Sequence, residues 1–187
     1  MSLHVAIIVG STRPGRKSES VARWIHESAQ GRDDAIFEIV DLDDCGLPLL
    51  DEPQAARSGV YANAYTRAWS ERIGAFDAFI FVTPEYNGSI PGVLKNAIDF
   101  LYHEWCGKVA AFVGYGYRGG ARAIDHLRQV MNDLTVIDVP TALELCIFED
   151  FKNHTLFVPR AEQSANLDVV LDELIGQSAL AKPGLAE

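Results

Sequence analysis

Residues 3–18 read LHVAIIVGSTRPGRKS, and this stretch decides the fold. Residues 3–9 form a short apolar run rich in β-branched side chains, which predicts a buried strand. Gly10 ends the run, a basic and hydroxyl-rich loop follows, and a helical pattern begins at Ser18. A strand that passes through such a loop into a helix is the first part of a strand–helix–strand unit. The stretch therefore predicts a parallel sheet with crossover helices.

The same alternation continues along the chain. Further strands are predicted over 37–42, 77–83, 108–114 and, interrupted by Pro140, about 136–145. Helices are predicted over 18–30, 60–76, 92–105, 121–134 and 163–180, with an irregular connection over 43–57. Five strands alternating with about five helices imply an α/β fold with helices on both faces of the sheet. Since no repeat or linker divides the chain, we expect one domain over 1–187, with a disordered tail at 181–187.

Composition limits the classes of function. The chain has 187 residues and a formal net charge of -10, so its bulk field repels phosphate and argues against a nucleic-acid partner. No stretch approaches about 18 apolar residues and no signal-peptide pattern opens the chain, so no membrane segment is expected. The three cysteines are far apart and odd in number, which favours a reducing compartment. We expect a cytoplasmic protein without a metal site.

Three loops are candidates for a ligand site. In an open parallel sheet, ligands bind beyond the carboxyl ends of the strands, where strand order reverses. The loops that leave the first, third and fourth strands cover 10–18, 83–91 and 114–120. All three are rich in Gly, Pro, Asn or Ser, and each leads into a predicted helix.

The first loop, GSTRPGRKS (10–18), nearly spells a nucleoside-triphosphate phosphate loop. Its two glycines have the required four residues between them, but Arg16 intrudes before Lys17. A solvated basic turn with Ser18 as a helix N-cap is the alternative. Free N–H groups at a helix start, together with Arg13 and its basic neighbours, favour an anion site.

The third loop, GYGYRGG (114–120), holds a second near-motif. Gly114, Gly116 and Gly119 form G-x-G-x-x-G between a strand and a helix, and Asp138 follows about twenty residues on. One interpretation is a dinucleotide site, although the intervening tyrosines and arginine would crowd a pyrophosphate. The other is that small residues admit the edge of a flat ligand while tyrosines wall it.

The middle loop contains PEYNG (84–88). Asn87-Gly88 suits positive φ and predicts a tight turn, which is one complete explanation of the motif. A turn alone, however, needs no exposed Tyr86, and Pro84 stiffens the backbone before it. A planar heterocycle with donors and acceptors on its rim would fit these residues.

Four pieces of the chain together resemble a known family. The pieces are GSTRPGRKSESVA (10–22), LPLLDEP (47–53), TPEYNGSIPGVLKNAIDF (83–100) and GYGYRGGARA (114–123). They occur in this order in a chain that resembles the NADPH-dependent FMN reductase family of flavodoxin-like proteins, which includes quinone, azo-dye and chromate reductases. The resemblance covers roughly residues 3–180. It implies a flavodoxin-like three-layer α/β/α sandwich with a five-stranded parallel sheet of order 2-1-3-4-5.

The resemblance also implies where FMN binds without a covalent bond. In such proteins the first loop holds the FMN phosphate, and the other two loops contact the isoalloxazine ring. The implied cofactor-binding residues are Ser11, Arg13, Arg16, Ser18, Pro84, Glu85, Tyr86, Asn87, Gly88, Gly114, Tyr115, Gly116 and Gly119. No catalytic acid or base is expected, because the flavin carries the chemistry, and the five histidines are expected to be structural or exposed.

The activity that the resemblance implies is ping-pong hydride transfer through bound FMN. NADPH or NADH would reduce the flavin, and a quinone, azo dye, metal ion or free flavin would accept the electrons. Members of the family are commonly homodimers or homotetramers. Two alternatives stay open: a non-enzymatic electron carrier, whose acidity would suit basic redox partners, and a module that senses flavin or redox state.

Overall fold

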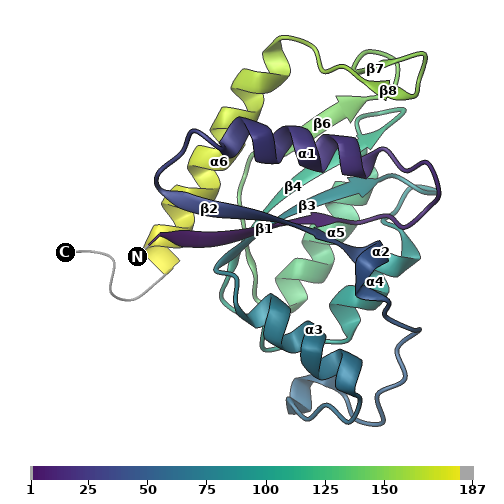
Figure 1. Cartoon of the computed structure of the whole chain (residues 1–187), viewed down its shortest axis with the longest axis vertical. Helices are drawn as coiled ribbons and strands as arrows, with labels where there is room; N and C mark the ends of the chain where they lie inside the picture. The colour runs from purple at the N-terminus through teal and green to yellow at the C-terminus, as the bar shows by residue number, and fades with distance from the viewer. Residues whose placement is uncertain (1, 182–187) are drawn as a thin grey trace.

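A twisted parallel sheet runs through the centre of the computed structural model, which describes residues 2–181 (Figure 1). Its strands are β1 (Leu3–Val9), β2 (Ala35–Asp41), β3 (Ala78–Pro84), β4 (Val109–Gly116), β5 (Ile137–Asp138) and β6 (Leu143–Cys146). They are arranged in the order β2-β1-β3-β4-β5, and β6 also pairs with β4. This arrangement confirms the predicted order 2-1-3-4-5.

The edge beyond β4 consists of two short strands rather than one. β5 pairs with the start of β4, and β6 pairs with its end. Pro140 lies between them, and a proline has no N–H to donate to a strand ladder. The predicted interruption at Pro140 is therefore confirmed.

Helices cover both faces of the sheet and complete the three-layer α/β/α sandwich. They are α1 (Ser18–Ala29), α2 (Leu42–Cys45), η1 (Ala56–Ser58), α3 (Ala64–Gly74), α4 (Gly92–Asp99), α5 (Ala121–Asp133) and α6 (Glu162–Ala181). α1 and α6 pack on one face, and α3, α4 and α5 pack on the other (Figure 1). Within residues 2–181 no helix has the length and apolarity needed to cross a bilayer. The predicted tail, apart from Ala181, lies outside the described residues.

The central strands have apolar side chains on both sides. In β1, Val5, Ile7 and Val9 belong to the core under α1 and α6, while Ala6 and Ile8 belong to the core under the other helices. Side chains of a strand alternate between its faces, so a strand covered on both faces must be apolar at every position. The unbroken apolar run in the sequence follows from this burial.

The helix boundaries near α3 and α4 differ from the prediction. α3 begins at Ala64 rather than at residue 60, and α4 ends at Asp99 although its pattern continues to Trp105. Trp105 is fully buried, its indole N–H donates to the carbonyl of Ile98 at 3.1 Å, and its ring lies 4.8 Å from that of Phe79. Burying this large ring in the core turns the chain away from the helix axis.

A small antiparallel hairpin of β7 (Phe151–Lys152) and β8 (Leu156–Phe157) is absent from the prediction. The ring of Phe151 lies 5.9 Å from that of Tyr115 at the end of β4. Phe157 meets Trp24 of α1 edge-on at 5.4 Å. The hairpin therefore packs over the same edge of the sheet at which the candidate loops lie.

Candidate functional site

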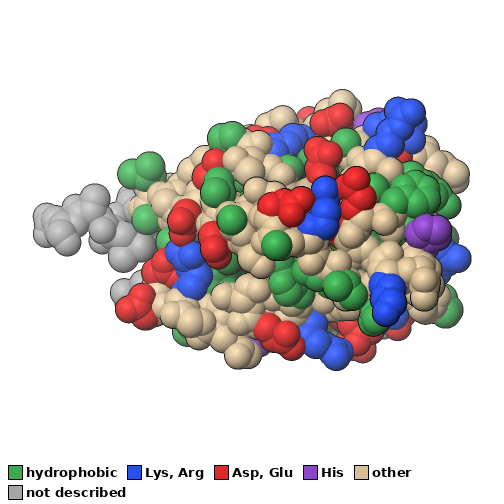
Figure 2. Space-filling view, turned by 90° about the horizontal axis from the view of Figure 1, so that it is seen from above, with side chains coloured by type: hydrophobic (Ala, Val, Ile, Leu, Met, Phe, Trp, Pro, Cys, Tyr) green, Lys and Arg blue, Asp and Glu red, His purple; other side chains and the backbone are tan. Residues whose placement is uncertain are grey.

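The three candidate loops meet at the carboxyl ends of β1, β3 and β4 around a cleft of about 280 Å³. Strand order reverses beside β1, which is where open parallel sheets bind ligands. A larger hollow of about 600 Å³ lies along α4 and α5 and contains no residue of the first loop. The cleft is lined by Arg13, Gly15, Arg16, Lys17, Pro84, Glu85, Tyr86, Tyr115, Gly116, Tyr117, Ile147 and His154. At this end of the molecule, on the right in Figure 2, basic side chains, a histidine and a hydrophobic patch lie close together.

The first loop contains one cation that is paired with acidic side chains and two that are not paired within the described residues. Arg16 donates to Asp41 at 2.7 Å and lies 3.4 Å from Asp43, and its hydrogen bond to Asp41 raises its pKa above the ordinary value. Its charge is therefore largely balanced within the protein. Arg13 and Lys17 form no ion pair with any described residue, so their charges remain available to an anion in the cleft.

Ser18 opens α1 behind these cations. Its side-chain oxygen is fully buried and has no hydrogen-bond partner within residues 2–181, and the same is true of the buried Nε of Arg16. The Ser18 backbone N–H donates to the phenolic oxygen of Tyr115 at 3.1 Å. Burial raises the pKa of Tyr115 to about 12, so this phenol stays protonated at neutral pH. The helix start thus offers several groups to an acceptor-rich anion.

The middle loop is a two-residue hairpin turn. Asn87 and Gly88 both have positive φ, 52° and 79°, and Tyr86 and Ser89 exchange backbone hydrogen bonds of 2.8 and 3.1 Å. This confirms the predicted turn. The hydroxyls of Tyr86 and Ser11 lie 3.0 Å apart, so the tyrosine ring is fixed against the first loop and faces the cleft.

Glu85 joins the middle loop to the third. Its carboxylate accepts from Nε and Nη2 of Arg122, at 2.9 and 2.5 Å, and from the Arg122 backbone N–H at 3.3 Å. Its own backbone N–H donates to the carbonyl of Tyr115 at 3.1 Å. The side chain of Glu85 is 10% exposed, and its charge is committed to Arg122.

The glycines of the third loop have different roles. Gly116 lines the cleft. A Cβ at Gly114 would lie 2.8 Å from the side chain of Ile124, and a Cβ at Gly119 would lie 2.6 Å from that of Glu144. Side chains of α5 and β6 therefore already occupy the space that a larger residue would need at these two positions. These two glycines allow close approach between elements of the protein.

The dinucleotide interpretation of this loop lacks its acidic partner. Asp138 pairs in register with Ala110 at the start of β4, whereas the glycines lie at the end of that strand. It also forms an ion pair with Arg128. The acidic residue of the near-motif therefore lies beside the start of β4, at the other end of the strand from the glycines.

Seven of the predicted cofactor-binding residues line the cleft, namely Arg13, Arg16, Pro84, Glu85, Tyr86, Tyr115 and Gly116. The others lie outside the lining: Ser11, Ser18, Asn87, Gly88, Gly114 and Gly119. Tyr117 also lines the cleft, as expected if the tyrosines of the third loop wall a flat ligand. The cleft is lined as well by Ile147 and His154, which were not predicted to do so. The last two come from the segment after β6, where strands of two residues leave no periodicity in the sequence.

The cleft has a cationic end and aromatic sides. Arg13, Lys17 and the start of α1 suit a phosphate group. The two other loops supply aromatic side chains that suit a flat ring, namely Tyr86, Tyr115 and Tyr117. Gly116 has no side chain, so a ring can approach the backbone there. The arrangement can hold an organic ligand that combines a phosphate with a planar ring system.

Comparison with known proteins gives the same combination. Residues 3–148 match the family described as NADPH-dependent FMN reductase. The chain is 39% identical over 148 residues to an NAD(P)H-dependent FMN reductase of Schizosaccharomyces pombe, covering 78% of this chain and 74% of the relative. It is 38% identical over 150 residues to a quinone reductase of Pseudomonas putida, covering 74% and 75%.

A solved structure extends the likeness beyond the family match. The flavoenzyme FerB of Paracoccus denitrificans, an NAD(P)H:(acceptor) oxidoreductase, superposes with a TM-score of 0.73 at 26% identity. The superposition covers 94% of this chain and 98% of that one.

Proposed function

The chain belongs to the NADPH-dependent FMN reductase family, and we propose that it binds FMN in the carboxyl-edge cleft and transfers hydride from NADPH or NADH to a small acceptor such as a quinone. The observation that carries the proposal is one cleft that combines aromatic sides with a cationic end. The cations are Arg13 and Lys17, which form no ion pair among the described residues. The named relatives that act on quinones support the class of acceptor.

The cationic end of the cleft suits the FMN phosphate because buried polar atoms there lack hydrogen-bond partners among the described residues. A buried polar atom without a partner is costly and rare, and the first loop holds two, Ser18 Oγ and Arg16 Nε. Phosphate oxygens would satisfy such donors. Arg13 would add a charge-assisted hydrogen bond, and Ser11, which accepts from the Arg13 backbone N–H at 3.4 Å, would hold the loop in shape.

The aromatic side of the cleft suits the FMN ring because the residues that line it are held in fixed positions. Tyr86 is held by Ser11, and the turn at Asn87-Gly88 fixes the backbone that follows. Glu85 links this turn to the start of α5 through its hydrogen bond with Arg122. The protein thereby orients a planar ring before any co-substrate arrives, which lowers the entropic cost of the reaction.

When bound, FMN supplies the ring that takes a hydride from the reduced nicotinamide and gives it to the acceptor. The chain's residues bind and orient it. Arg13, Lys17 and the start of α1 fix the phosphate, and the second and third loops shield the ring from water. No side chain needs to act as acid or base.

Assembly and location form part of the same proposal. We propose a homodimer or homotetramer in the cytoplasm. Leu49 is 84% exposed and Val60 is 55% exposed, and apolar side chains left open in this connection favour self-association. The three cysteines are free, as suits a reducing compartment. Light scattering after gel filtration tests the assembly: a monomeric wild-type protein would contradict it.

The decisive experiment starts from the visible spectrum of the purified protein. We expect oxidised flavin bands, directly or after reconstitution with FMN, and quinone-dependent oxidation of NADPH that exceeds the rate with free FMN. Bound FMN without such turnover would favour an electron carrier. Protein that stays colourless under all reconstitution conditions would contradict the proposal.

A further inference from the structure

The β7–β8 hairpin brings a histidine to the cleft from a segment outside the family match, which ends at residue 148. His154 stands in the hairpin loop and lines the cleft together with Arg13 and Lys17. Asn153 and His154 both have positive φ, 53° and 57°. Non-glycine residues seldom adopt this backbone, and Asn and His are among those that tolerate it best.

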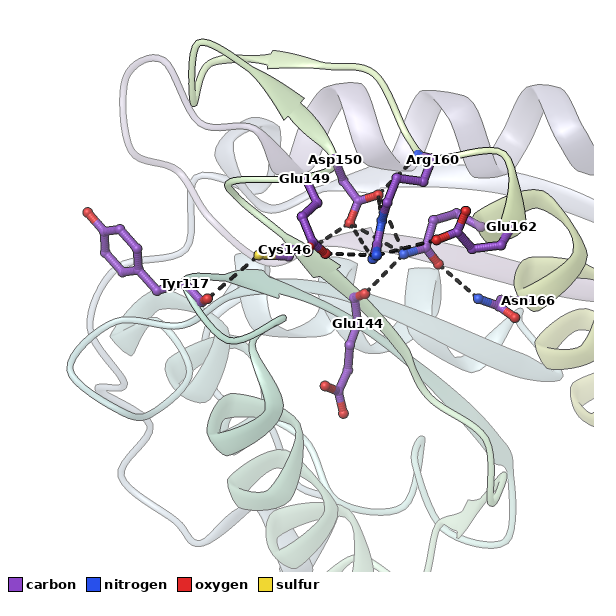
Figure 3. Close-up of polar contacts among 9 residues, drawn as sticks. Tyr117, Glu144, Cys146, Glu149, Asp150, Arg160, Glu162 and Asn166 are labelled. Atoms are coloured by element: carbon purple, nitrogen blue, oxygen red, sulfur yellow. Dashed lines mark hydrogen bonds and ion pairs between the residues drawn. The ribbon is translucent and has the colours of Figure 1, made fainter.

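A buried carboxylate anchors the segment that carries His154. Asp150 is fully buried and accepts from the backbone N–H of Cys146 at 2.8 Å and from that of Arg160 at 3.0 Å. It also accepts from Nε of Arg160 at 3.0 Å and from Gln163 at 3.3 Å (Figure 3). Asp150 therefore ties both ends of the segment 146–160 together. The hairpin between them is held at a fixed place on the sheet edge.

Aromatic contacts orient the imidazole. The ring of His154 meets that of Phe148 edge-on at 5.1 Å, and Phe148 lies 5.4 Å from Tyr117. Within the described chain, neither ring nitrogen of His154 has a hydrogen-bond partner. The imidazole is thus held in place while its polar atoms remain available to a ligand.

The charges around the cleft favour an anion near His154. The carboxylates around the cleft are already paired: Glu85 in its lining with Arg122, and Asp41 beside the first loop with Arg16. On the segment that carries His154, Glu149 and Asp150 are both paired with Arg160. Arg13 and Lys17 have no such partner among residues 2–181. A group that carries close to two negative charges and several acceptor oxygens would match these cations and an imidazole N–H.

We propose that His154 is a specificity-determining residue that binds the phosphomonoester group of a ligand in this cleft. The inference rests on the proposed function and deepens it. Two ligands of that function carry a phosphomonoester, namely FMN at its ribityl end and NADPH on its adenosine ribose. Riboflavin and NADH lack the group, so each pair gives a matched comparison.

The test uses three variants of the full-length protein. His154→Asn removes the imidazole but tolerates the left-handed backbone, so the hairpin fold is preserved. His154→Arg replaces the imidazole with another side chain that can donate a hydrogen bond to a phosphate. Lys152→Gln removes a positive charge from the same hairpin at a position that does not line the cleft, and serves as the control. Circular dichroism and thermal midpoints confirm that all three are folded.

Binding is measured without turnover. Quenching of flavin fluorescence gives dissociation constants for FMN and riboflavin with the apoprotein, and calorimetry gives those for NADP⁺ and NAD⁺ with the FMN-loaded protein. In His154→Asn we expect the phosphorylated member of one pair to lose roughly fivefold in affinity, since an exposed charge-assisted contact is worth about 1 kcal/mol, while its partner is unchanged. His154→Arg should retain the preference, and Lys152→Gln should bind as wild type does.

The outcomes separate the inference from the proposed function. If wild type binds FMN but His154→Asn changes neither pair, or weakens both members of each pair equally, the inference is overturned and the proposed function stands. If wild type binds neither flavin, both are overturned. Loss in the flavin pair assigns His154 to the FMN phosphate, and loss in the nicotinamide pair assigns it to the co-substrate.

Discussion

The phenolic oxygen of Tyr115 accepts a hydrogen bond from the backbone N–H of Ser18 at 3.1 Å, although 97 positions separate the two residues. The bond joins the end of β4 to the start of α1 and brings a buried, neutral tyrosine to the cationic end of the cleft. The first and third loops are therefore held together by an uncharged contact, which leaves the nearby positive charges for a ligand.

This contact predicts an unusual loss of stability at high pH. The pKa of Tyr115 is raised by burial to about 12 in the folded protein, against about 10 when unfolded. A raised folded pKa means that the stabilisation is complete below about pH 10 and is lost as the pH rises toward 12. We expect the free energy of unfolding to fall over this range by about 2 kcal/mol more in wild type than in Tyr115→Phe. Urea unfolding at several pH values measures this; parallel curves would contradict it.

Arg13→Ala should weaken FMN binding far more than riboflavin binding. Arg13 has no ion-pair partner among the described residues, and charge-assisted hydrogen bonds to phosphate are strong. We expect roughly a tenfold to hundredfold loss for FMN, corresponding to about 1.5–3 kcal/mol. Fluorescence titration measures both flavins. Arg23→Ala is the matched control, because Arg23 pairs with Glu19 on the exposed side of α1. Equal losses for FMN and riboflavin would remove Arg13 from the phosphate site.

Gly120→Ala should destabilise the fold severely. Gly120 has φ of 82°, and a Cβ there would lie 2.6 Å from the backbone nitrogen of Tyr115. Strain and overlap together should lower the free energy of unfolding by about 3 kcal/mol or more. Gly176→Ala is the opposite case, because nothing lies within 4 Å and the position is inside α6. There we expect a gain of about 0.5–1 kcal/mol, measured by the same denaturant curves. If Gly120→Ala left the free energy of unfolding unchanged, β4 and α5 would be able to move apart at little cost, which would contradict the prediction.

Asp150→Asn should loosen the segment that forms one wall of the cleft. An amide would turn its NH₂ group toward N–H groups that now point at the buried carboxylate, and it would remove the buried negative charge that pairs with Nε of Arg160. We expect a loss of about 3 kcal/mol in the free energy of unfolding. Glu162→Gln is the control in the same cluster, because Glu162 is 57% exposed and should matter by less than about 0.5 kcal/mol. Faster amide exchange in the β7–β8 hairpin should accompany the first change and not the second.

Much of the architecture was accessible from local patterns. The apolar runs of the central strands, the helices between them and the interruption at Pro140 each leave a signature a few residues long. The same is true of the turn at Asn87-Gly88, where residue type dictates the backbone. The rule that ligands bind beyond the carboxyl ends of parallel strands then directed attention to the three loops that meet at the cleft.

The partners of individual side chains were not accessible in this way. Trp105 leaves a helical pattern because a distant core receives its ring, and Gly114 and Gly119 leave room for neighbours on α5 and β6. Such contacts depend on which helices and strands become neighbours in the fold. The hydrophobic periodicity of one segment does not indicate which other segment will pack against it. The hairpin strands are two residues long, so they have no period to detect.

By itself, the sequence determined the succession of strands and helices, the parallel sheet and the presence of a basic loop at its first turn, since these follow from local hydrophobic spacing and residue type. Only the tertiary structure decided how the charges of that loop are divided. Asp41 lies beside Val9 because β2 pairs with β1, and it therefore neutralises Arg16. Arg13 and Lys17 have no ion-pair partner among residues 2–181, so their charges can meet a ligand. The physical reason is that an ion pair depends on distances in space, which the pairing of strands sets.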